Sequence, residues 1–335
     1  MQTTKTSVLE PVAESVPETV KLETVQLITK GFLGSCWYGK YHYLEPWIGC
    51  EHNCHYCYAR SRKIIQNSLA LHALPFARTA LYYSSLDKLL QTIQMELQQE
   101  QVKILKLCRY TDIFTPSRVT DGTANAVLKT ICEKSAVERI IITTKGIPNQ
   151  EIIRLMGQHP ERFSYNSVIL PSSEDPLHLH ANVQSEQIKT AAEIKALGIK
   201  TTIHFDPICY SIFDTSSQWE DFLIKFKTAS LNRVMFSYMM LDEIMKKNLA
   251  EKLDPALFQQ LLSIFDKQTT VDYSFVDEKT YYMDATIRQK HIELLAALLT
   301  KHQFEFTLCS IKSVRGVDLK SSNSNCPACT GDFYA

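Results

Sequence analysis

The sequence carries no excess charge of either sign, since Lys and Arg total 36 and Asp and Glu also total 36 among 335 residues. This balance excludes a general polyanion binder, which carries a large basic excess. No apolar run approaches the ~20 residues that span a bilayer, and the first residues, MQTTKTSVLE, lack the pattern of a secretory signal. We therefore expect a cytoplasmic protein with no membrane partner.

Cysteine, by contrast, is frequent: the chain has ten, although a protein of this length does not need disulfides to hold its core. In a reducing compartment, clustered cysteines more often bind metal or take part in chemistry than cross-link. Three of the ten lie within residues 50–57 and three within the last 27 residues. These two groups are where a functional site is expected.

Strand and helix patterns alternate between residues 85 and 238. We expect strands at 102–107, 139–144, 164–170, 200–205 and 233–238, and helices at 85–99, 124–134, 150–156, 186–197 and 218–227. Strands separated by helices of this length indicate βαβ units and a parallel sheet. Chemistry in such sheets gathers in the loops after the strands, which begin here at Cys108, Lys145, Pro171, Asp206 and Met239.

The two ends of the chain have a different character. Residues 1–44 read as a polar lead-in with a short strand at 24–29, and the alternating core occupies about 45–240. Residues 241–335 are predicted to contain helices at 255–268 and 288–302, followed by an irregular tail anchored by cysteines.

The first cysteine group, Cys50, Cys54 and Cys57, has the spacing C-x3-C-x2-C in the loop GCEHNCHYCYAR. Three thiolates on one tight loop can hold three irons of a [4Fe–4S] cluster and leave the fourth iron open for a ligand. The alternatives are a zinc site that also uses His52 or His55, or a chance spacing.

This spacing, with the aromatic Tyr56 before the third cysteine, resembles the signature of the radical S-adenosylmethionine (SAM) superfamily. The fuller string resembles spore photoproduct lyase and its relatives, and the resemblance continues through TDIFTPSR, IIITTKG, FSYNSVIL and IHFDPI over about residues 45–240. It implies an α/β fold, an incomplete (β/α)6-type parallel barrel of about six strands. The barrel would be open on one side and covered by the helical and irregular residues 241–335.

The resemblance also implies roles for particular residues. Cys50, Cys54 and Cys57 would hold the [4Fe–4S] cluster, and SAM would chelate its open iron. Tyr56 would touch the adenine, and Tyr58 would return hydrogen to SAM.

Two further positions match family residues. Lys145 matches the lysine that pairs with the SAM carboxylate, and Ser167 matches a serine near the SAM ribose. The alternatives are a solvated loop lysine for Lys145 and a core position for Ser167.

Cys108 lies near the position of the family cysteine that donates hydrogen to the product radical. The family spacing is C-x2-D, whereas this chain has three residues between Cys108 and Asp112, so Arg109 occupies the aligned position. A shift of one residue on a strand turns a side chain to the other face, although a bulge can restore it. Cys108 is therefore either a hydrogen donor or a buried small apolar residue.

The C-terminal cysteines, Cys309, Cys326 and Cys329, depart from the resemblance. They could hold a second Fe–S cluster, bind zinc with Cys36, act as thiol donors or a redox pair, or have no role. Cys132 falls inside a predicted helix and is expected in the core.

Local charge offers a clue about the substrate. Residues 60–120 contain nine Lys and Arg against four acids, which suits either a DNA-facing surface or a solvated helix face.

The expected function is that of a radical SAM enzyme. It would cleave SAM reductively to a 5′-deoxyadenosyl radical for hydrogen abstraction, with electrons from a flavodoxin- or ferredoxin-type reductant. Repair of a thymine-dimer-type lesion in damaged DNA is the first expectation. Radical modification of a peptide, RNA or small molecule is the second, and a non-catalytic metal-binding module is the third.

Overall fold

The computed structural model describes residues 25–31, 41–171, 184–209, 216–271, 280–309 and 333. In this part of the chain the main sheet has eight strands in the order β1-β2-β5-β6-β7-β8-β9-β12. All neighbouring pairs are parallel except β1 with β2. The strands are β1 (Ile28–Lys30), β2 (His42–Leu44), β5 (Ile104–Leu107), β6 (Arg139–Thr144), β7 (Phe163–Val168), β8 (Lys200–Ile208), β9 (Arg233–Tyr238) and β12 (Glu305–Leu308).

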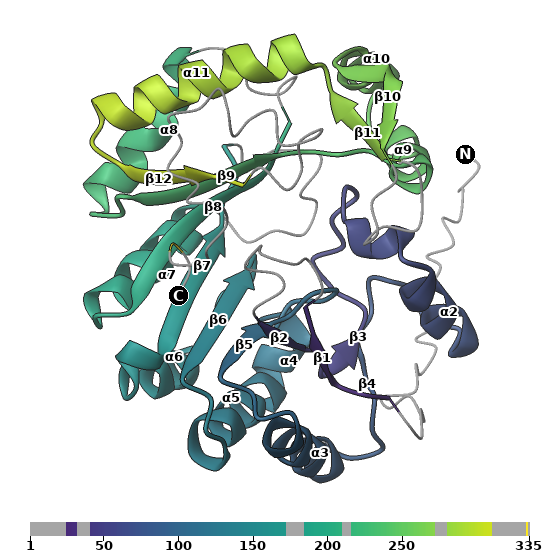
Figure 1. The fold of residues 1–335 in the computed structure, drawn as a ribbon, viewed down its shortest axis with the longest axis vertical. Helices are drawn as coiled ribbons and strands as arrows, with labels where there is room; N and C mark the ends of the chain where they lie inside the picture. Colours follow the sequence, from purple (N-terminus) through teal and green to yellow (C-terminus); the bar gives the residue numbers. More distant parts are fainter. Residues whose placement is uncertain are drawn as a thin grey trace, which may run out of the picture.

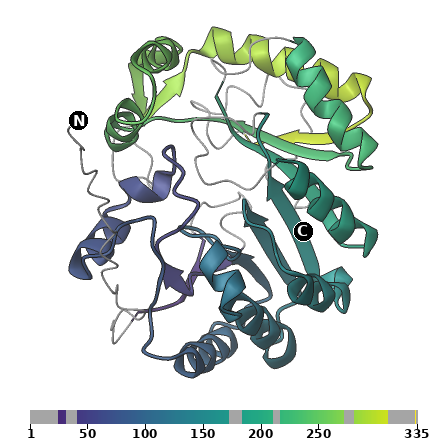
Figure 2. The ribbon, with the colours of Figure 1, turned by 180° about the vertical axis from the view of Figure 1, so that it is seen from behind.

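Helices follow the strands and lie along the outer side of the curved sheet (Figures 1 and 2). The edge strands β1 and β12 do not pair with each other, so the barrel is open. The helices that separate the sheet strands are α3 (Leu86–Gln99), α4 (Pro116–Thr120), α5 (Thr123–Lys134), α6 (Gln150–Gly157), α7 (Gln184–Ala196), α8 (Ser216–Thr228), α9 (Glu243–Ala250), α10 (Pro255–Ser263) and α11 (Ala285–Lys301). Helix α2 (Lys63–Leu71) and the 3-10 turns η1 (Tyr58–Ser61) and η2 (Pro160–Arg162) complete this set. Within the described residues, no helix is both long and apolar enough to cross a membrane.

The core lies between the sheet and these helices, and the central strands are buried on both faces. Every residue of β7 is buried, as are Ile140, Ile141 and Ile142 of β6. On β8, the ring of Phe205 packs among aromatic side chains of α8, with ring centroids 5.7 Å from Trp219 and 5.2 Å from Phe222. Burial of one such side chain contributes about 1.5–3 kcal/mol, so this packing holds the parallel strands in place.

Helix boundaries follow local capping chemistry. The Ser85 hydroxyl accepts from the Lys88 amide at 3.2 Å at the start of α3, and the Asn149 side chain accepts from the Ile152 amide at 3.0 Å at the start of α6. After α7, Gly198 adopts a positive φ of 85°, the left-handed conformation expected of a glycine after a helix.

The incomplete parallel barrel predicted from the sequence is confirmed, with more strands than the six expected. Strand β12, from the C-terminal region, pairs in parallel with β9, and β2, from the lead-in, pairs in parallel with β5. Both strands are short, so they can be recognised as strands only from their pairing with distant segments. The first strand, Ile28–Lys30, overlaps only the end of the expected span of 24–29.

The helix predicted over residues 255–268 was wrong at its end. Helix α10 stops at Ser263, and β10 (Phe265–Val271) forms an antiparallel ribbon with β11 (Thr280–Met283). The backbone register pairs Phe265 with Met283, so a contact with a segment further along the chain replaces the last helical turn. A second small sheet joins β3 (Trp47–Ile48) to β4 (Ala80–Leu81) beside the cysteine loop.

Candidate functional site

A cavity of about 230 Å³ lies where the strands of the main sheet end. The loops after β5, β6 and β9 contribute to its wall, together with the end of β8 and the cysteine loop, as expected for a parallel α/β sheet. Its lining includes Cys50, Cys54, Cys57, Tyr56, Tyr58, Cys108, Arg109, Asp112, Lys145, Asp206 and Cys309.

The three cysteines of the loop meet in this cavity. Cys54 is buried, and Cys50 and Cys57 are half-buried. Burial raises the pKa of the Cys50 thiol, and the nearby Asp112, Cys54 and Cys57 raise it further. The three thiols are thus close enough to interact electrostatically.

Within the described residues, no three His, Cys, Asp or Glu side chains converge on a point that a single metal ion would occupy. A [4Fe–4S] cluster differs from a single ion, because each of its cysteines binds a different iron. Two cations lie near the thiols, since the thiols act to raise the pKa values of both Arg60 and Lys145 against the effect of burial. The donor set and its charge surroundings therefore fit a three-cysteine cluster.

The shape of the cysteine loop is held by its own backbone contacts. Arg60, in η1, donates from Nε to the Cys54 carbonyl at 3.0 Å, and its guanidinium lies 4.3 Å from the centre of the Phe76 ring. The Cys50 amide donates to the Phe76 carbonyl at 2.8 Å. Gly49 precedes the loop with a positive φ of 81°, and a Cβ there would collide with the Arg78 carbonyl, so only glycine suits this position.

The segment 111–118, TDIFTPSR, anchors the cysteine loop from the other side. The Thr111 hydroxyl donates to the Gly49 carbonyl, and the Glu51 amide donates to the Thr115 hydroxyl at 3.1 Å. The Glu51 carboxylate in turn accepts from the Ser117 amide at 2.8 Å, at the start of α4. The string TDIFTPSR was part of the family resemblance but had no role assigned to it. These contacts give it one, because they hold the cysteine loop in place.

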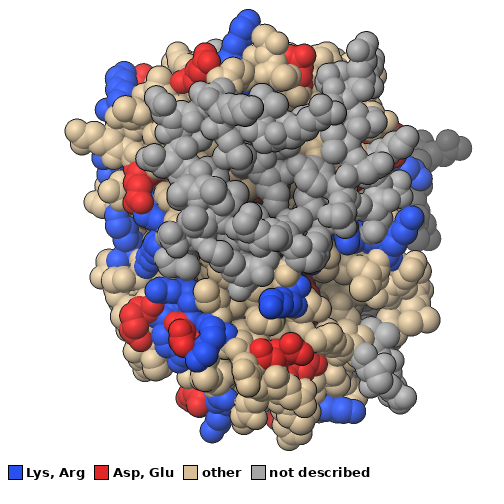
Figure 3. Space-filling view, viewed as in Figure 1, with Lys and Arg blue, Asp and Glu red and all other residues tan. Residues whose placement is uncertain are grey.

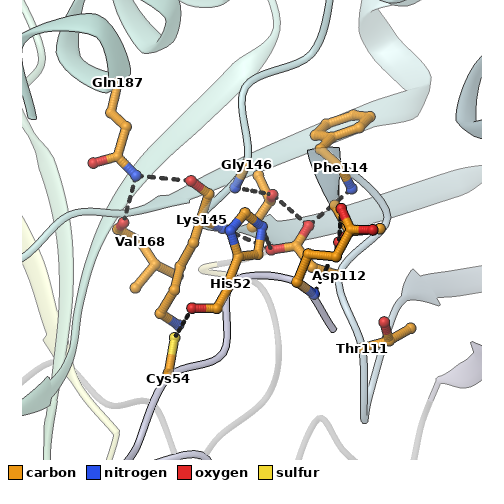
Figure 4. A network of polar contacts seen from close by, with 12 residues as sticks. His52, Cys54, Thr111, Asp112, Phe114, Lys145, Gly146, Val168 and Gln187 are labelled. Carbon is orange, nitrogen blue, oxygen red and sulfur yellow. Dashed lines mark hydrogen bonds and ion pairs between the residues drawn. The ribbon is translucent and has the colours of Figure 1, made fainter. Parts of the chain in front are cut away.

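Asp112 is the centre of a buried polar network that sequence reasoning missed (Figure 4). Its Oδ1 accepts from the Thr144 hydroxyl at 2.6 Å and from the Phe114 amide at 2.9 Å. Its Oδ2 accepts from the Lys145 amide at 2.8 Å and lies 3.3 Å from His52 Nε2. Burial alone would raise the pKa of Asp112, but His52 and the hydrogen bonds lower it to about 2.

Through this network, one carboxylate joins the cysteine loop to the end of β6. His52 lies between Cys50 and Cys54, and Lys145 directly follows β6. Gln187 of α7 fixes the same turn, because its amide donates to the Lys145 carbonyl at 2.9 Å (Figure 4). The only sequence signal for Asp112 was its spacing from Cys108.

Lys145 is a cation that lines the cavity beside the cysteines. It is half-buried, and its Nζ lies 5.6 Å from the centre of the Tyr56 ring. Burial acts to lower the pKa of Lys145, but Cys54, Cys57, Asp112 and Asp206 raise it above its ordinary value. A lysine charged at neutral pH, beside the cysteines and facing a cavity, suits a carboxylate ligand.

Tyr58 and Cys108 both line the cavity. The Tyr58 hydroxyl donates to the Arg109 carbonyl, and its ring centroid lies 6.2 Å from that of Tyr110. Cys108 is buried and lines the cavity together with Arg109, despite the difference in spacing. Burial, then Glu45 and Asp112, raise the pKa of Cys108, so its sulfur keeps the proton. A protonated thiol is suited to donate hydrogen rather than to act as a nucleophile.

The structure places the remaining predicted residues at different distances from the cavity. Ser167 is buried in β7 and does not belong to the residues that line the cavity. Cys309, directly after β12, does line it, whereas Cys326 and Cys329 lie outside the described residues, as does Cys36. Cys132 is buried in α5, as predicted for a core position.

Four methionines also line the cavity. Met235 on β9, Met239 and Met240 after it, and Met245 on α9 all line the cavity. Methionine side chains are flexible and polarizable, so they adapt to flat or irregular ligands. In Figure 3, the described part of the visible surface shows basic and acidic side chains interspersed, consistent with the net charge of zero.

No protein-family model matches the chain, and no curated protein sequence matches it. Among solved structures, spore photoproduct lyase complexed with dinucleoside spore photoproduct is similar, with a TM-score of 0.59 and 12% identity over 86% of this chain and 81% of that one. A spore photoproduct lyase variant with bound AdoMet and the same dinucleoside gives a TM-score of 0.57 and 12% identity, over 86% and 80%. The chain therefore has the fold of spore photoproduct lyase, a radical SAM fold.

Proposed function

We propose that this protein is a radical SAM enzyme that holds a [4Fe–4S] cluster on Cys50, Cys54 and Cys57. The observation that carries the proposal is that all three cysteines line one cavity at the strand ends of this fold. The cluster, when bound, supplies the electron that cleaves SAM to methionine and a 5′-deoxyadenosyl radical. Since such a cluster and free thiols need a reducing environment, we place the protein in the cytoplasm.

The protein's own side chains bind and orient the reactants. Lys145 attracts the SAM carboxylate, and the ring of Tyr56 lies beside it for the adenine. Asp112 holds the Lys145 backbone and His52, and so keeps this cation in register with the cysteine loop.

Cys108 and Tyr58 supply hydrogen. The Cys108 thiol would give a hydrogen atom to the substrate radical, and Tyr58 would relay a hydrogen atom from 5′-deoxyadenosine back to the Cys108 sulfur, which allows SAM to re-form. The raised pKa of Cys108 supports this role, because a thiolate has no hydrogen to donate.

A DNA lesion is the substrate that we infer first. The solved structures of similar fold contain a dinucleoside spore photoproduct. In this chain, Lys106 and Arg109 line the cavity and can neutralise a phosphate. The second candidate is radical modification of a peptide, RNA or small molecule. Cys309 in the cavity and the shifted position of Cys108 favour it.

Anaerobic reconstitution tests the proposed chemistry. The wild type should bind about four irons, absorb near 400 nm with bleaching by dithionite, and convert SAM to 5′-deoxyadenosine. Joint replacement of Cys50, Cys54 and Cys57 by Ala should lower the iron count by about four and abolish SAM cleavage. The matched control is Cys132→Ala, since Cys132 is buried but away from the cavity. SAM cleavage by the triple variant would overturn the assignment.

The C-terminal cysteines allow a further count. If Cys309, Cys326 and Cys329 hold a second cluster, the wild type binds about eight irons and a variant with Ala at these three positions binds about four. An equal iron count in both proteins would show that these three cysteines do not hold a second cluster.

The substrate is tested by binding. Ultraviolet-irradiated duplex DNA should bind more tightly than intact DNA, and its affinity should fall as salt is raised. No preference for the irradiated duplex would favour the second candidate.

A further inference from the structure

The Glu45 side chain holds the turn that follows Cys108. Its Oε1 accepts from the Tyr110 amide at 3.0 Å and also from the Arg109 amide, and these are the two residues directly after Cys108. The side chain is half-buried and does not belong to the residues that line the cavity. Glu45 can therefore act on the reaction only through the loop that it binds.

The main sheet brings Glu45 to this turn. Strand β2 ends at Leu44, which is aligned with Leu107, the last residue of β5. Glu45 and Cys108 therefore leave two neighbouring parallel strands at the same level. The Glu45 amide donates to the Leu27 carbonyl at 3.0 Å, which fixes its backbone beside the start of β1. Beyond the last paired residues, a side chain of one strand thus continues the bonding to the backbone of the next.

The two hydrogen bonds also define the shape of the turn. Neighbouring amides of an extended strand point in opposite directions, whereas here both point at one oxygen atom. Successive amides arranged in this way form a concave backbone that binds an anion or a carbonyl oxygen. Because the chain bends directly after Cys108, residues 108–112 all line the cavity instead of alternating between two faces.

The acceptor oxygen, rather than a permanent charge, makes these bonds. Burial raises the pKa of Glu45 to about 7, although the amides of the loop and the Arg109 guanidinium act to lower it. Near neutral pH about half of the molecules therefore carry a protonated Glu45. A protonated carboxyl group keeps its carbonyl oxygen as an acceptor, and so does the side-chain amide of glutamine. Glutamine at this position should preserve the turn, whereas alanine should release it.

We propose that Glu45 is the positioning residue of Cys108, because it binds the two amides after the cysteine and so keeps the thiol at the cavity wall. The proposal rests on the proposed function, since Cys108 needs this placement only if it donates hydrogen to a substrate radical. In that step the S–H bond of Cys108 breaks, a C–H bond of the substrate forms, and the unpaired electron passes from carbon to sulfur. Glu45 exchanges no atom or electron.

Amide hydrogen exchange in the cluster-free full chain tests the contact without using activity. In Glu45→Ala the amides of Arg109 and Tyr110 lose their acceptor, so both should exchange at least about tenfold faster than in the wild type. In Glu45→Gln a carbonyl oxygen still accepts from both amides, and their exchange should stay within about threefold of the wild type. Unchanged exchange in Glu45→Ala, or an equal increase in Glu45→Gln, would overturn the proposal.

The matched control is Asp284→Ala. Asp284 is half-buried, and its Oδ1 likewise accepts from two successive amides, those of Thr286 at 2.9 Å and Ile287 at 3.0 Å at the start of α11. It does not belong to the residues that line the cavity. The control should speed exchange at its own two amides and leave the turn after Cys108 protected. Faster exchange of that turn in the control as well would overturn the proposal, because the effect would then be general loosening.

The coupling of SAM cleavage to product separates positioning from a general loss of structure. With dinucleoside spore photoproduct as the probe, the ratio of 5′-deoxyadenosine to repaired product rises whenever the substrate radical misses the thiol. Glu45→Ala should raise this ratio at least about tenfold, and Glu45→Gln should keep the wild-type ratio. Adding Glu45→Ala to Cys108→Ala should change nothing further, because the thiol to be positioned is already absent. Independent losses that multiply in the double variant would overturn the proposal.

Failure of the proposed function gives a different result. A wild type that fails to cleave SAM would refute the proposed function, and one that cleaves SAM without forming repaired product would refute the lesion as its substrate. In either case the exchange of the Arg109 and Tyr110 amides still decides whether Glu45 holds the turn.

Discussion

Replacement of Asp112 by Asn tests whether one buried carboxylate holds the cysteine loop against the end of β6. The substitution keeps the shape of the side chain but replaces one acceptor oxygen with an NH2 group. If Oδ1 still accepts from Thr144 and Phe114, the new amide nitrogen stands where Oδ2 now accepts from the Lys145 amide at 2.8 Å. The flipped arrangement instead removes the acceptor for Phe114.

The expected loss of stability follows from these contacts. A hydrogen bond to a buried charged group contributes about 1.5–3 kcal/mol, and leaving His52 without its carboxylate adds to this. We expect the free energy of unfolding to fall by about 2–4 kcal/mol. The lowered pKa of Asp112 agrees, because a change from 3.8 to about 2 corresponds to about 2 kcal/mol.

The effect has a defined pH dependence. Because the pKa of Asp112 is lower in the folded protein, its stabilisation is fully present above about pH 5, well above the ordinary pKa of 3.8, and is lost progressively as the pH falls toward about 2. The difference between wild type and Asp112→Asn should therefore shrink from pH 7 to pH 3.5.

Urea unfolding of the cluster-free protein under anaerobic conditions measures both effects. Asp87→Asn removes the same charge from an exposed position in the first turn of α3 and should change stability by less than about 1 kcal/mol. A loss below about 0.5 kcal/mol for Asp112→Asn, or a loss that does not change with pH, would refute the role of the network.

Four other substitutions test separate parts of the site. Glu45→Gln should gain stability relative to wild type between pH 5 and pH 8 in urea midpoints, because burial raises the pKa of Glu45 to about 7 and its ionisation destabilises the fold. Gly146→Ala should lower the free energy of unfolding by about 3 kcal/mol in the same assay, since the added Cβ would collide with the Phe114 carbonyl. Lys145→Met should weaken SAM binding at least about tenfold in equilibrium dialysis while iron content stays unchanged. Cys108→Ala should leave SAM cleavage intact but reduce repaired product, followed by chromatography, at least about tenfold.

Two of these substitutions have a matched control. Gly157→Ala meets only the flexible Leu197 side chain, 3.1 Å from its Cδ1, and should be close to neutral. Cys132→Ala should keep full product formation. A Glu45→Gln midpoint that tracks wild type across the pH range would show that this carboxylate stays ionised. An unchanged yield of repaired product from Cys108→Ala would show that Cys108 is not the hydrogen donor.

Local patterns in the sequence were sufficient for much of the fold. The β-branched run RIIITT predicted β6, and the apolar spacing in 85–99 predicted α3 with Ser85 as its cap. The same regularity did not reveal β10, because Ile264 and Phe265 continue the apolar helical spacing of α10, although Phe265 pairs with Met283 of β11. Strands β2 and β12 are too short to be recognised before their neighbours in the sheet are known.

In the candidate site, too, some features could be predicted from the sequence and others could not. The spacing of Cys50, Cys54 and Cys57 on one short loop predicted a shared ligand set, because residues so close in sequence cannot be far apart in space. Whether Cys108 faces the same cavity was open, since a shift of one residue reverses a strand side chain and only the path of the loop after β5 decides it. The contact of Asp112 with His52 was also hidden, because 60 residues separate the two.

By itself, then, the sequence determined the alternation of strands and helices, the balanced charge and the cysteine loop, all of which depend on residues near one another in the chain. Only the tertiary structure decided which strands lie side by side, which thiols share a cavity, and which carboxylate joins the loop to β6. The physical reason is that burial and hydrogen-bond partners in a parallel sheet come from segments far apart in sequence, whose register no local pattern specifies.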